Sequence, residues 1–176
     1  MKNVLFLFGQ LTDEDEEWMM HHGNRRMALK GTAVIEQGQA TRSLFIVLHG
    51  ELQVVNASEP SRILATLGPG EIVGEMSFVD ARPPSATVQC ASTSVLFALD
   101  RELLEEKIEE DPLFAANFYR SLAIFLSHRI RTVMGGEAGD EDFDELDPNA
   151  LDGISRAGDR FERLLNRFFS QTLNTV

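Results

Sequence analysis

The most informative stretch of this 176-residue sequence covers residues 70–88 and reads GEIVGEMSFVDARPPSATV. Gly70 and Gly74 allow the backbone to turn sharply and to approach a ligand closely. The residues after Gly74 are expected to form one helical turn, whose free N–H groups attract phosphate. The carboxylate of Glu75 can accept hydrogen bonds from sugar hydroxyls, and a neighbouring arginine offers charge-assisted donors to an anion. These residues fit a compact nucleotide site, but by themselves they favour an ordinary glycine-rich turn that leads into a strand.

Short runs with high β-propensity surround this stretch on both sides. The predicted strands cover residues 32–36, 43–48, 52–55, 62–67, 86–89 and 94–99, and a polar turn is expected at residues 56–61. Glycine or proline separates most of these runs, as at Gly68-Pro69-Gly70. This spacing is typical of a β-sandwich or barrel rather than of alternating βαβ units.

Helices are predicted before and after the strands. Thr12 is a candidate N-cap for a short helix that runs through Trp18 to about residue 22. Asp100 is a candidate cap for a helix over residues 101–110, and Asp111-Pro112 begins a longer helix that ends near Gly135-Gly136. The apolar stripe of this longer helix comprises Leu122, Leu126, Ile130 and Val133, widened by Phe118 and Phe125.

A last helix is predicted over residues 154–173. One side is apolar and carries Phe161, Leu164, Leu165, Phe168 and Phe169. The arginines at 156, 160, 163 and 167 recur on another side, which is expected to be a solvated face. We expect the apolar side to dock on the chain's own domain, on a second subunit or on an effector protein.

Composition limits the possible classes of protein. The length suits one domain with an appendage, which we divide into a domain at 1–134, an acidic linker at 135–147 and a terminal helix at 148–176. No apolar run approaches the length of a membrane span, and the longest covers only residues 4–8. The single cysteine, Cys90, cannot form an intrachain disulfide, so we expect a reducing, cytoplasmic setting.

The sequence resembles a known family. Residues 70–88 are similar to the phosphate-binding cassette of the cyclic-nucleotide-binding domain family, which includes catabolite activator proteins and kinase regulatory subunits. Residues 35–38, 44–54 and 68–71 resemble the family's first β-hairpins and the turn that enters the cassette. The resemblance covers about residues 12–134. It implies a mainly β fold, a jelly-roll-like β-roll with flanking helices and a long C-terminal helix.

The resemblance also implies a set of ligand-binding residues. Glu75 matches the glutamate that holds the ribose 2′-hydroxyl, and the residues beside it offer backbone N–H groups. Pro84 stands where the family has its phosphate-binding arginine, and Arg82 lies two residues earlier, from where a strand-like segment would point it in the same direction. The predicted site residues are Gly74, Glu75, Met76, Ser77, Arg82, Ser85 and Ala86.

Three classes of function are weighed. The first is a regulatory sensor that binds cyclic AMP or cyclic GMP and transmits the signal through its helices. The second is a degenerate β-roll that binds no nucleotide and acts as a dimerisation or protein-docking module. The third is an enzyme on a similar barrel, such as a metal-dependent cupin, but the sequence has no His-x-His ligand pair and no Ser/His/Asp signature. We therefore expect no enzyme activity and no required metal or cofactor.

Charge and length also bear on partners. The net charge of −12 repels polyanions, and residues 135–176 hold ten acidic residues against four arginines. This segment is short for a helix-turn-helix module, so we expect no sequence-specific DNA binding. The long helix resembles the family's dimerisation helix, and a homodimer or an effector protein is the expected partner.

Overall fold

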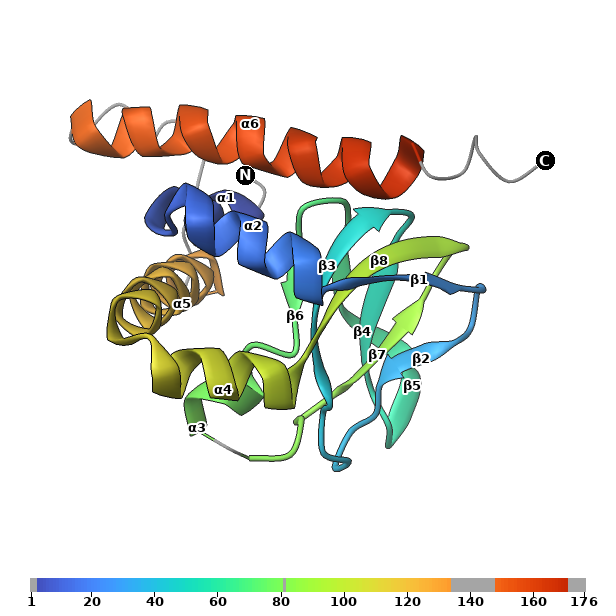
Figure 1. Ribbon diagram of the computed structural model, residues 1–176. Coiled ribbons are helices and arrows are strands. Elements are labelled where there is room, and N and C mark those ends of the chain that lie inside the picture. The colour runs from blue at the N-terminus through green and yellow to red at the C-terminus, as the bar shows by residue number, and fades with distance from the viewer. Residues whose placement is uncertain (1–2, 81, 134–147, 171–176) are drawn as a thin grey trace. The chain divides into compact units, whose positions relative to one another are not determined.

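The computed structural model describes residues 3–80, 82–133 and 148–170, and the chain forms two compact units (Figure 1). The β unit spans Met19–Glu106, and the helical unit combines Met1–Trp18 with Lys107–Val176. The strands are β1 (Asn24–Ala28), β2 (Ala33–Ile35), β3 (Ser43–His49), β4 (Leu52–Asn56), β5 (Glu59–Leu67), β6 (Ile72–Val73), β7 (Thr87–Cys90) and β8 (Ser94–Asp100). The helices are α1 (Val4–Gln10), α2 (Asp13–His22), α3 (Met76–Asp80), α4 (Arg101–Glu110), α5 (Pro112–Val133) and α6 (Pro148–Ser170). The predicted linker, and the predicted end of the longer helix at Gly135-Gly136, lie outside the described residues.

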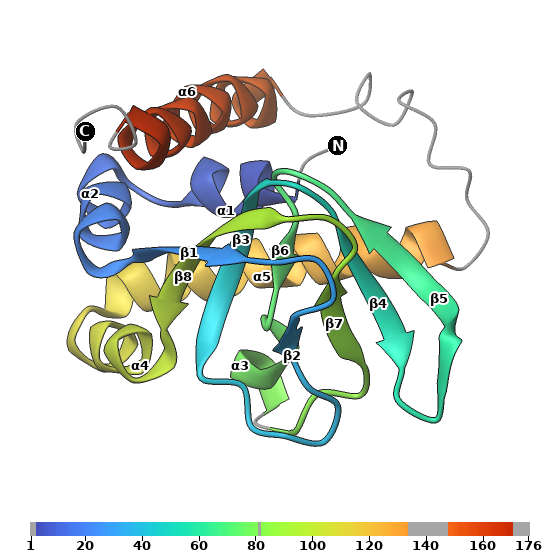
Figure 2. The same cartoon turned by 90° about the vertical axis from the view of Figure 1, so that its right-hand side faces the viewer.

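The β unit is a two-sheet roll. Within the described residues, the strands form two four-stranded antiparallel sheets, in the orders β1-β8-β3-β6 and β2-β7-β4-β5 (Figure 2). Alternate residues of each strand meet between the sheets, because successive side chains point to opposite faces. The core holds Ala28, Ile35, Phe45, Val47, Leu52, Leu67, Val73, Val88, Cys90, Leu96 and Ala98. The predicted fold, a mainly β roll with flanking helices and a long helix, is confirmed.

Six strands agree with the sequence prediction, whereas β1 and β6 were not predicted. The strand β1 has a polar sequence and is held by pairing with β8, while β6 is only two residues long. The turn expected at residues 56–61 is also shorter than predicted, because Asn56 pairs with Glu59. Pro60 lies within β5, at the edge of its sheet, where a missing N–H group is tolerated.

Side-chain caps fix the starts of α2, α4 and α5 where the sequence predicts them. Thr12 and Asp15 cap each other's backbone N–H groups at 2.8 and 3.1 Å. Asp100 accepts a hydrogen bond from the N–H of residue 102 at 2.9 Å. Asp111 accepts from the N–H groups of residues 113 and 114, directly ahead of Pro112 at the first helical position.

The helical unit contains a helix that the sequence analysis did not predict. The apolar run at residues 4–8 forms part of α1, which buries Val4, Leu7 and Phe8 and packs against both α5 and α6. A helix this short is unstable alone, so its order depends on these tertiary contacts.

The apolar stripe predicted for α5 is split between two faces of the helix. Leu122 is 1% exposed and belongs to the inner face with Phe114, Phe118 and Phe125, whereas Ile130 is 57% exposed. Steps of four residues advance slightly more than one helical turn, so the stripe rotates from the inner face to the outer one. The side chain of Val133 lies outside the described residues.

The terminal helix docks on its own chain. The side of α6 formed by Ala157, Phe161, Leu164 and Phe168 is buried, and α6 packs against α1. The prediction that its arginines form a solvated face is wrong for Arg160, which is 6% exposed. Among the described residues, no helix combines the length and apolar character that a membrane span requires.

Candidate functional site

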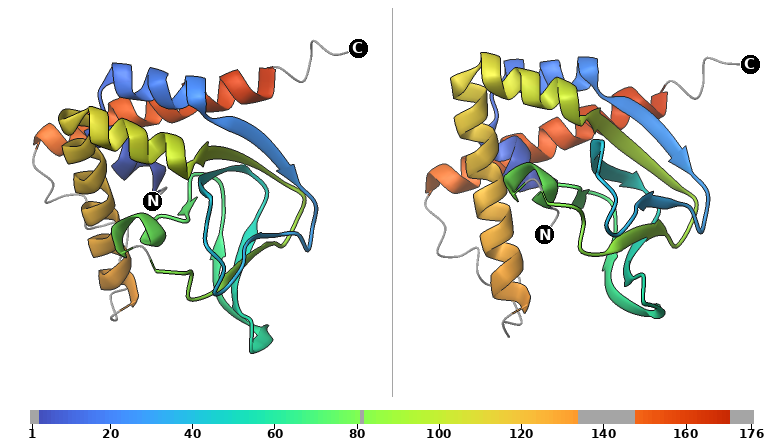
Figure 3. Two further views of the ribbon diagram at one scale, coloured as in Figure 1. Left: turned by 60° about the horizontal axis from the view of Figure 1, so that its bottom comes forward. Right: turned by 90° about the horizontal axis from the view of Figure 1, so that it is seen from below.

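The predicted site residues, between positions 74 and 86, lie in the connection between β6 and β7, which includes the short helix α3 (Figure 3). Pairing of β6 with β3 brings Gly74 against the start of β3. Gly74 has φ +93°, and a Cβ atom at this position would lie 2.7 Å from the Ser43 carbonyl oxygen. Only glycine fits here without strain, because both the backbone angle and the close approach exclude a side chain.

Glu75 is the most deeply buried acidic residue of this segment. It is 3% exposed, and its carbonyl oxygen accepts a hydrogen bond from the N–H of Phe78 at 3.0 Å. Carboxyl groups are rarely buried unless they are paired or hydrogen-bonded, because burial removes their hydration. The structure therefore places a buried carboxyl group at this turn, and the prediction that Glu75 contacts a sugar stays a prediction.

Met76 and Ser77 form the first turn of α3. The Met76 side chain is 52% exposed, whereas Ser77 is 4% exposed. The Ser77 hydroxyl donates to the carbonyl oxygen of Arg82 at 3.2 Å. This bond ties the end of the segment back to α3, so the Ser77 side chain has a positioning role.

Arg82 points into solvent, with 83% of its side chain exposed. Its backbone N–H donates to Asp80 Oδ1 at 3.1 Å, and its Nε lies 3.9 Å from Asp80 Oδ2. Two residues later, the carbonyl oxygen of Pro84 accepts a hydrogen bond from the N–H of Gly38 at 2.9 Å. In this structure the Arg82 guanidinium is thus associated with Asp80.

The last two predicted residues lead into β7. Ser85 is exposed and Ala86 is partly buried. Thr87 follows as the first residue of β7, and its Oγ1 accepts from the N–H of Gln37 at 3.1 Å. The segment is therefore anchored to the chain around residues 37–38 at both Pro84 and Thr87.

The structure adds Thr41 to this neighbourhood, a residue that the sequence analysis did not select. Thr41 is 8% exposed, and its Cγ2 lies 3.3 Å from the position that a Gly74 Cβ would take. Its Oγ1 is buried and has no hydrogen-bond partner in the described part of the chain. Nothing in the local sequence marks this residue, because it reaches Gly74 through the pairing of β3 with β6.

In the described ranges 3–80, 82–133 and 148–170, no group of three or more histidine, cysteine, aspartate or glutamate residues is arranged to hold a metal ion. The single cysteine, Cys90, is 2% exposed, and burial raises the pKa of its thiol.

Known proteins resemble this chain in sequence. Residues 25–111 match the family model of the cyclic nucleotide-binding domain. The cyclic AMP receptor protein of Thermus thermophilus is 33% identical over 127 residues, which make up 71% of this chain and 57% of that protein. The chain thus spans little more than half the length of this relative.

Solved structures show the same architecture. A crystal structure of the Thermus thermophilus catabolite activator protein matches with a TM-score of 0.59 and 25% identity, over 95% of this chain and 88% of that one. A cyclic nucleotide-binding domain from Methylobacillus flagellatus matches with a TM-score of 0.64 and 24% identity, over 74% and 76% of the two chains. The second likeness concerns the fold alone.

Proposed function

We propose that the protein is a regulatory sensor that binds cyclic AMP or cyclic GMP, because residues 25–111 match the family model of the cyclic nucleotide-binding domain. The observation that carries the proposal is the placement of Glu75, which is 3% exposed directly after a glycine with φ +93°. In this role the protein transmits ligand binding through its helices and catalyses no reaction.

Each predicted residue has a task in this proposal. The Glu75 carboxylate accepts hydrogen bonds from the ribose 2′-hydroxyl. The N–H groups of Met76 and Ser77 lie in the first turn of α3, where helical N–H groups have no partner within the helix, so they are available to the ligand. Ser85 and Ala86 line the side of the cyclic phosphate.

To bind the phosphate of the ligand, the Arg82 side chain has to move away from Asp80. Its ion pair with Asp80 is long and exposed, and such surface pairs contribute about 0–1 kcal/mol. Hydrogen bonds to a charged group contribute about 1.5–3 kcal/mol, so a bound phosphate can compete for the guanidinium. Arg82 then replaces the phosphate-binding arginine that the family has at the position of Pro84.

Calorimetric titration of the full chain with cyclic AMP, cyclic GMP and linear 5′-AMP tests the proposal. We expect binding of a cyclic nucleotide, and we expect Glu75→Ala to weaken it by about 1–3 kcal/mol, since a buried hydroxyl partner is lost. Glu59→Ala is the matched control, because Glu59 is an exposed acid of the same unit.

Arginine variants make the test more specific. Arg82→Gln is expected to weaken binding, whereas Arg62→Gln is not, because Arg62 forms a comparable exposed ion pair with Glu59 at 3.7 Å. No heat and no thermal shift at millimolar cyclic AMP or cyclic GMP would overturn the sensor proposal. That result would favour the alternative, a β-roll that binds no nucleotide and serves as a docking or dimerisation module.

A homodimer through the outer face of α5 is part of the proposal. Exposed or half-buried residues recur there at steps of three and four, namely Ala116, Tyr119, Ala123, Leu126 and Ile130. This spacing is that of a coiled-coil seam. We expect a dimer in analytical ultracentrifugation and a soluble monomer for Leu126→Glu. A wild-type protein that sediments as a monomer at tens of micromolar would contradict the dimer.

We propose no role for this chain in sequence-specific DNA binding. Arg160 and Arg163, two of the four arginines after residue 134, are paired with acidic residues of α2. A gel-shift assay against a random-sequence DNA library should enrich no motif, and a salt-sensitive, sequence-selective complex would overturn this expectation.

A further inference from the structure

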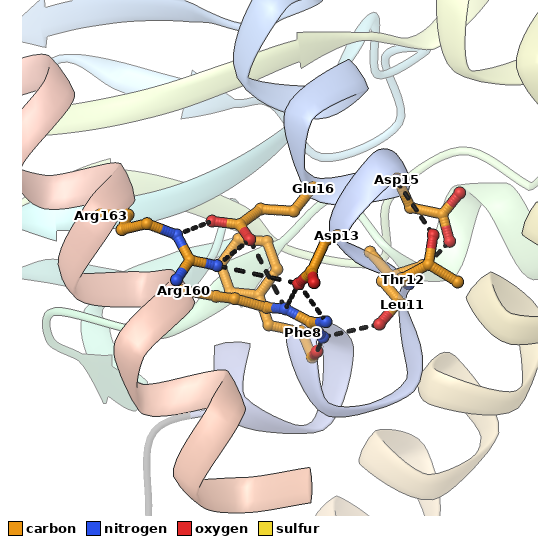
Figure 4. Close-up of polar contacts among 8 residues, drawn as sticks. All are labelled: Phe8, Leu11, Thr12, Asp13, Asp15, Glu16, Arg160 and Arg163. Carbon is orange, nitrogen blue, oxygen red and sulfur yellow. Dashed lines mark hydrogen bonds and ion pairs between the residues drawn. The ribbon is translucent and has the colours of Figure 1, made fainter.

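A cluster of charged residues joins α6 to the start of α2 within the helical unit. We call it the clasp, and it consists of Asp13, Glu16, Arg160 and Arg163 (Figure 4). Arg160 donates from Nη2 and Nε to Asp13 Oδ1 at 2.7 and 3.2 Å, and its Nε lies 3.5 Å from Glu16 Oε2. Arg163 donates from Nε to Glu16 Oε1 at 3.1 Å and from Nη2 to Glu16 Oε2. The partners Asp13 and Arg160 are 147 residues apart in the sequence.

Arg160 also contacts the end of α1. Its Nη1 donates to the carbonyl oxygen of Leu11 at 2.6 Å and to that of Phe8. The last carbonyl groups of a helix have no partner within the helix, and a cation there is favoured by the helix dipole. One guanidinium thus caps the end of α1 and pairs with the start of α2.

Burial divides the clasp into an inner and an outer part. The side chains of Glu16 and Arg160 are 2% and 7% exposed, whereas those of Asp13 and Arg163 are 85% and 52% exposed. The attraction within a buried ion pair is largely offset by the lost hydration of its charges, so the clasp adds little net affinity. Removing one buried partner is nevertheless costly, because it leaves the other charge without compensation. These charges therefore select the docked position of α6, whose buried apolar side supplies the packing.

The helix α1 depends on the same contacts. It has seven residues, too few for a stable isolated helix, and it packs against α6 and α5. If α6 leaves, α1 loses both the apolar contacts that α6 provides and the Arg160 cap on its carbonyl groups.

We propose that α1 and α6 dock and release as one cooperative element, with Arg160 as the residue that couples them. The terminal helix is then a releasable regulatory element. Its release uncovers the apolar side of α6 and leaves α1 disordered.

Amide hydrogen exchange measured by mass spectrometry on the full-length protein tests this coupling. For Arg160→Gln we expect exchange to rise about tenfold or more in both α1 and α6, with no change in β3 and β8 of the β unit. Arg167→Gln is the matched control, because it removes the same charge from an exposed position of the same helix. Equal exchange in the two variants, or a rise in α6 without a rise in α1, would overturn the proposal.

If Arg160→Gln does not fold, a variant in α1 tests the coupling instead. Leu7 is 1% exposed in α1, so Leu7→Ala weakens the packing of α1 without touching the clasp. We expect faster exchange in α6 as well as in α1, and a smaller joint rise for Arg163→Gln, whose arginine is half exposed. Unchanged exchange of α6 in Leu7→Ala would show that the helices release independently and would refute the coupling.

Discussion

The cassette segment at residues 74–86 and the clasp both contain a buried glutamate and an arginine, but they use the arginine differently. In the clasp, α6 brings Arg160 and Arg163 onto Glu16, and Arg160 is itself buried. In the cassette segment, Arg82 remains 83% exposed beside Asp80, while Glu75 is 3% exposed. The clasp fixes a helix through charges of its own chain, whereas the Arg82 guanidinium is exposed and is the cation that we propose an external anion recruits. The difference teaches that a buried acid need not be matched by a buried arginine, since the clasp has one and the cassette segment does not.

Gly74→Ala should have the largest effect on stability, and it should act on the cassette segment without disturbing the clasp. The new Cβ would lie 2.7 Å from a backbone oxygen, at a φ that side chains rarely adopt. We expect a loss of about 3–5 kcal/mol in the free energy of unfolding of the β unit, from strain and overpacking together. Urea unfolding followed by circular dichroism measures it. Gly68→Ala, where an added Cβ meets nothing within 4 Å, should stay near wild type; similar losses in both variants would refute the account of Gly74.

Glu16→Gln should break the clasp. The change leaves Arg160 buried with less compensation, and we expect about 2–4 kcal/mol less stability because Asp13 remains as a partner. The single tryptophan, Trp18, packs against Phe114 in the helical unit, so its fluorescence reports the transition. Glu14→Gln changes an exposed acid of the same helix and should alter stability by less than about 0.5 kcal/mol. Equal free energies of unfolding for the two variants would mean that the clasp does not contribute to stability.

Lowering the pH should destabilise the helical unit, because it protonates Asp13. Its hydrogen bond to Arg160, aided by the attraction of that charge, lowers the pKa of Asp13 below its ordinary value of 3.8. The stabilisation is therefore complete above the ordinary pKa and is lost as the pH falls through the lowered one. The pKa of Asp111 is also lowered below its ordinary value, chiefly by its hydrogen bond from Lys107, so Asp111 contributes to acid sensitivity with the same sign.

The acid effect can be assigned by comparing variants. Trp18 fluorescence across pH 6 to 2 should show a smaller loss of stability for Asp13→Asn than for wild type, and a smaller one again when Asp111→Asn is added. The stability difference between Gly74→Ala and wild type should not depend on pH in this range, since it arises from backbone strain. An Asp13→Asn protein with the wild-type acid profile would exclude this source of pH dependence.

Thr41→Val should have the smallest effect, and it should be stabilising. The substitution removes a buried hydroxyl without a partner and keeps the shape of the side chain, so we expect about 1 kcal/mol of added stability. Thr87→Val is the matched comparison, because Thr87 Oγ1 accepts a hydrogen bond from the Gln37 N–H, and it should lose about 1 kcal/mol. A destabilised Thr41→Val protein would show that this hydroxyl has a partner in solution.

The sequence by itself determined what depends on near neighbours. Alternating apolar residues and glycine turns predicted six strands, and Thr12, Asp100 and Asp111 marked three helix starts, because caps and turns act within a few residues. The spacing from Gly70 to Val88 likewise indicated the position of the candidate site.

Only the tertiary structure decided the features that depend on distant partners. The strand β1 is polar and forms because β8 pairs with it, α1 is too short to persist without α5 and α6, and Thr41 meets Gly74 through the pairing of β3 with β6. The arginines of α6 look like a solvated face in the sequence, since nothing near them reveals acidic partners 147 residues away. Local propensities act over a few residues, whereas burial and charge pairing are set by which distant segments the fold brings together.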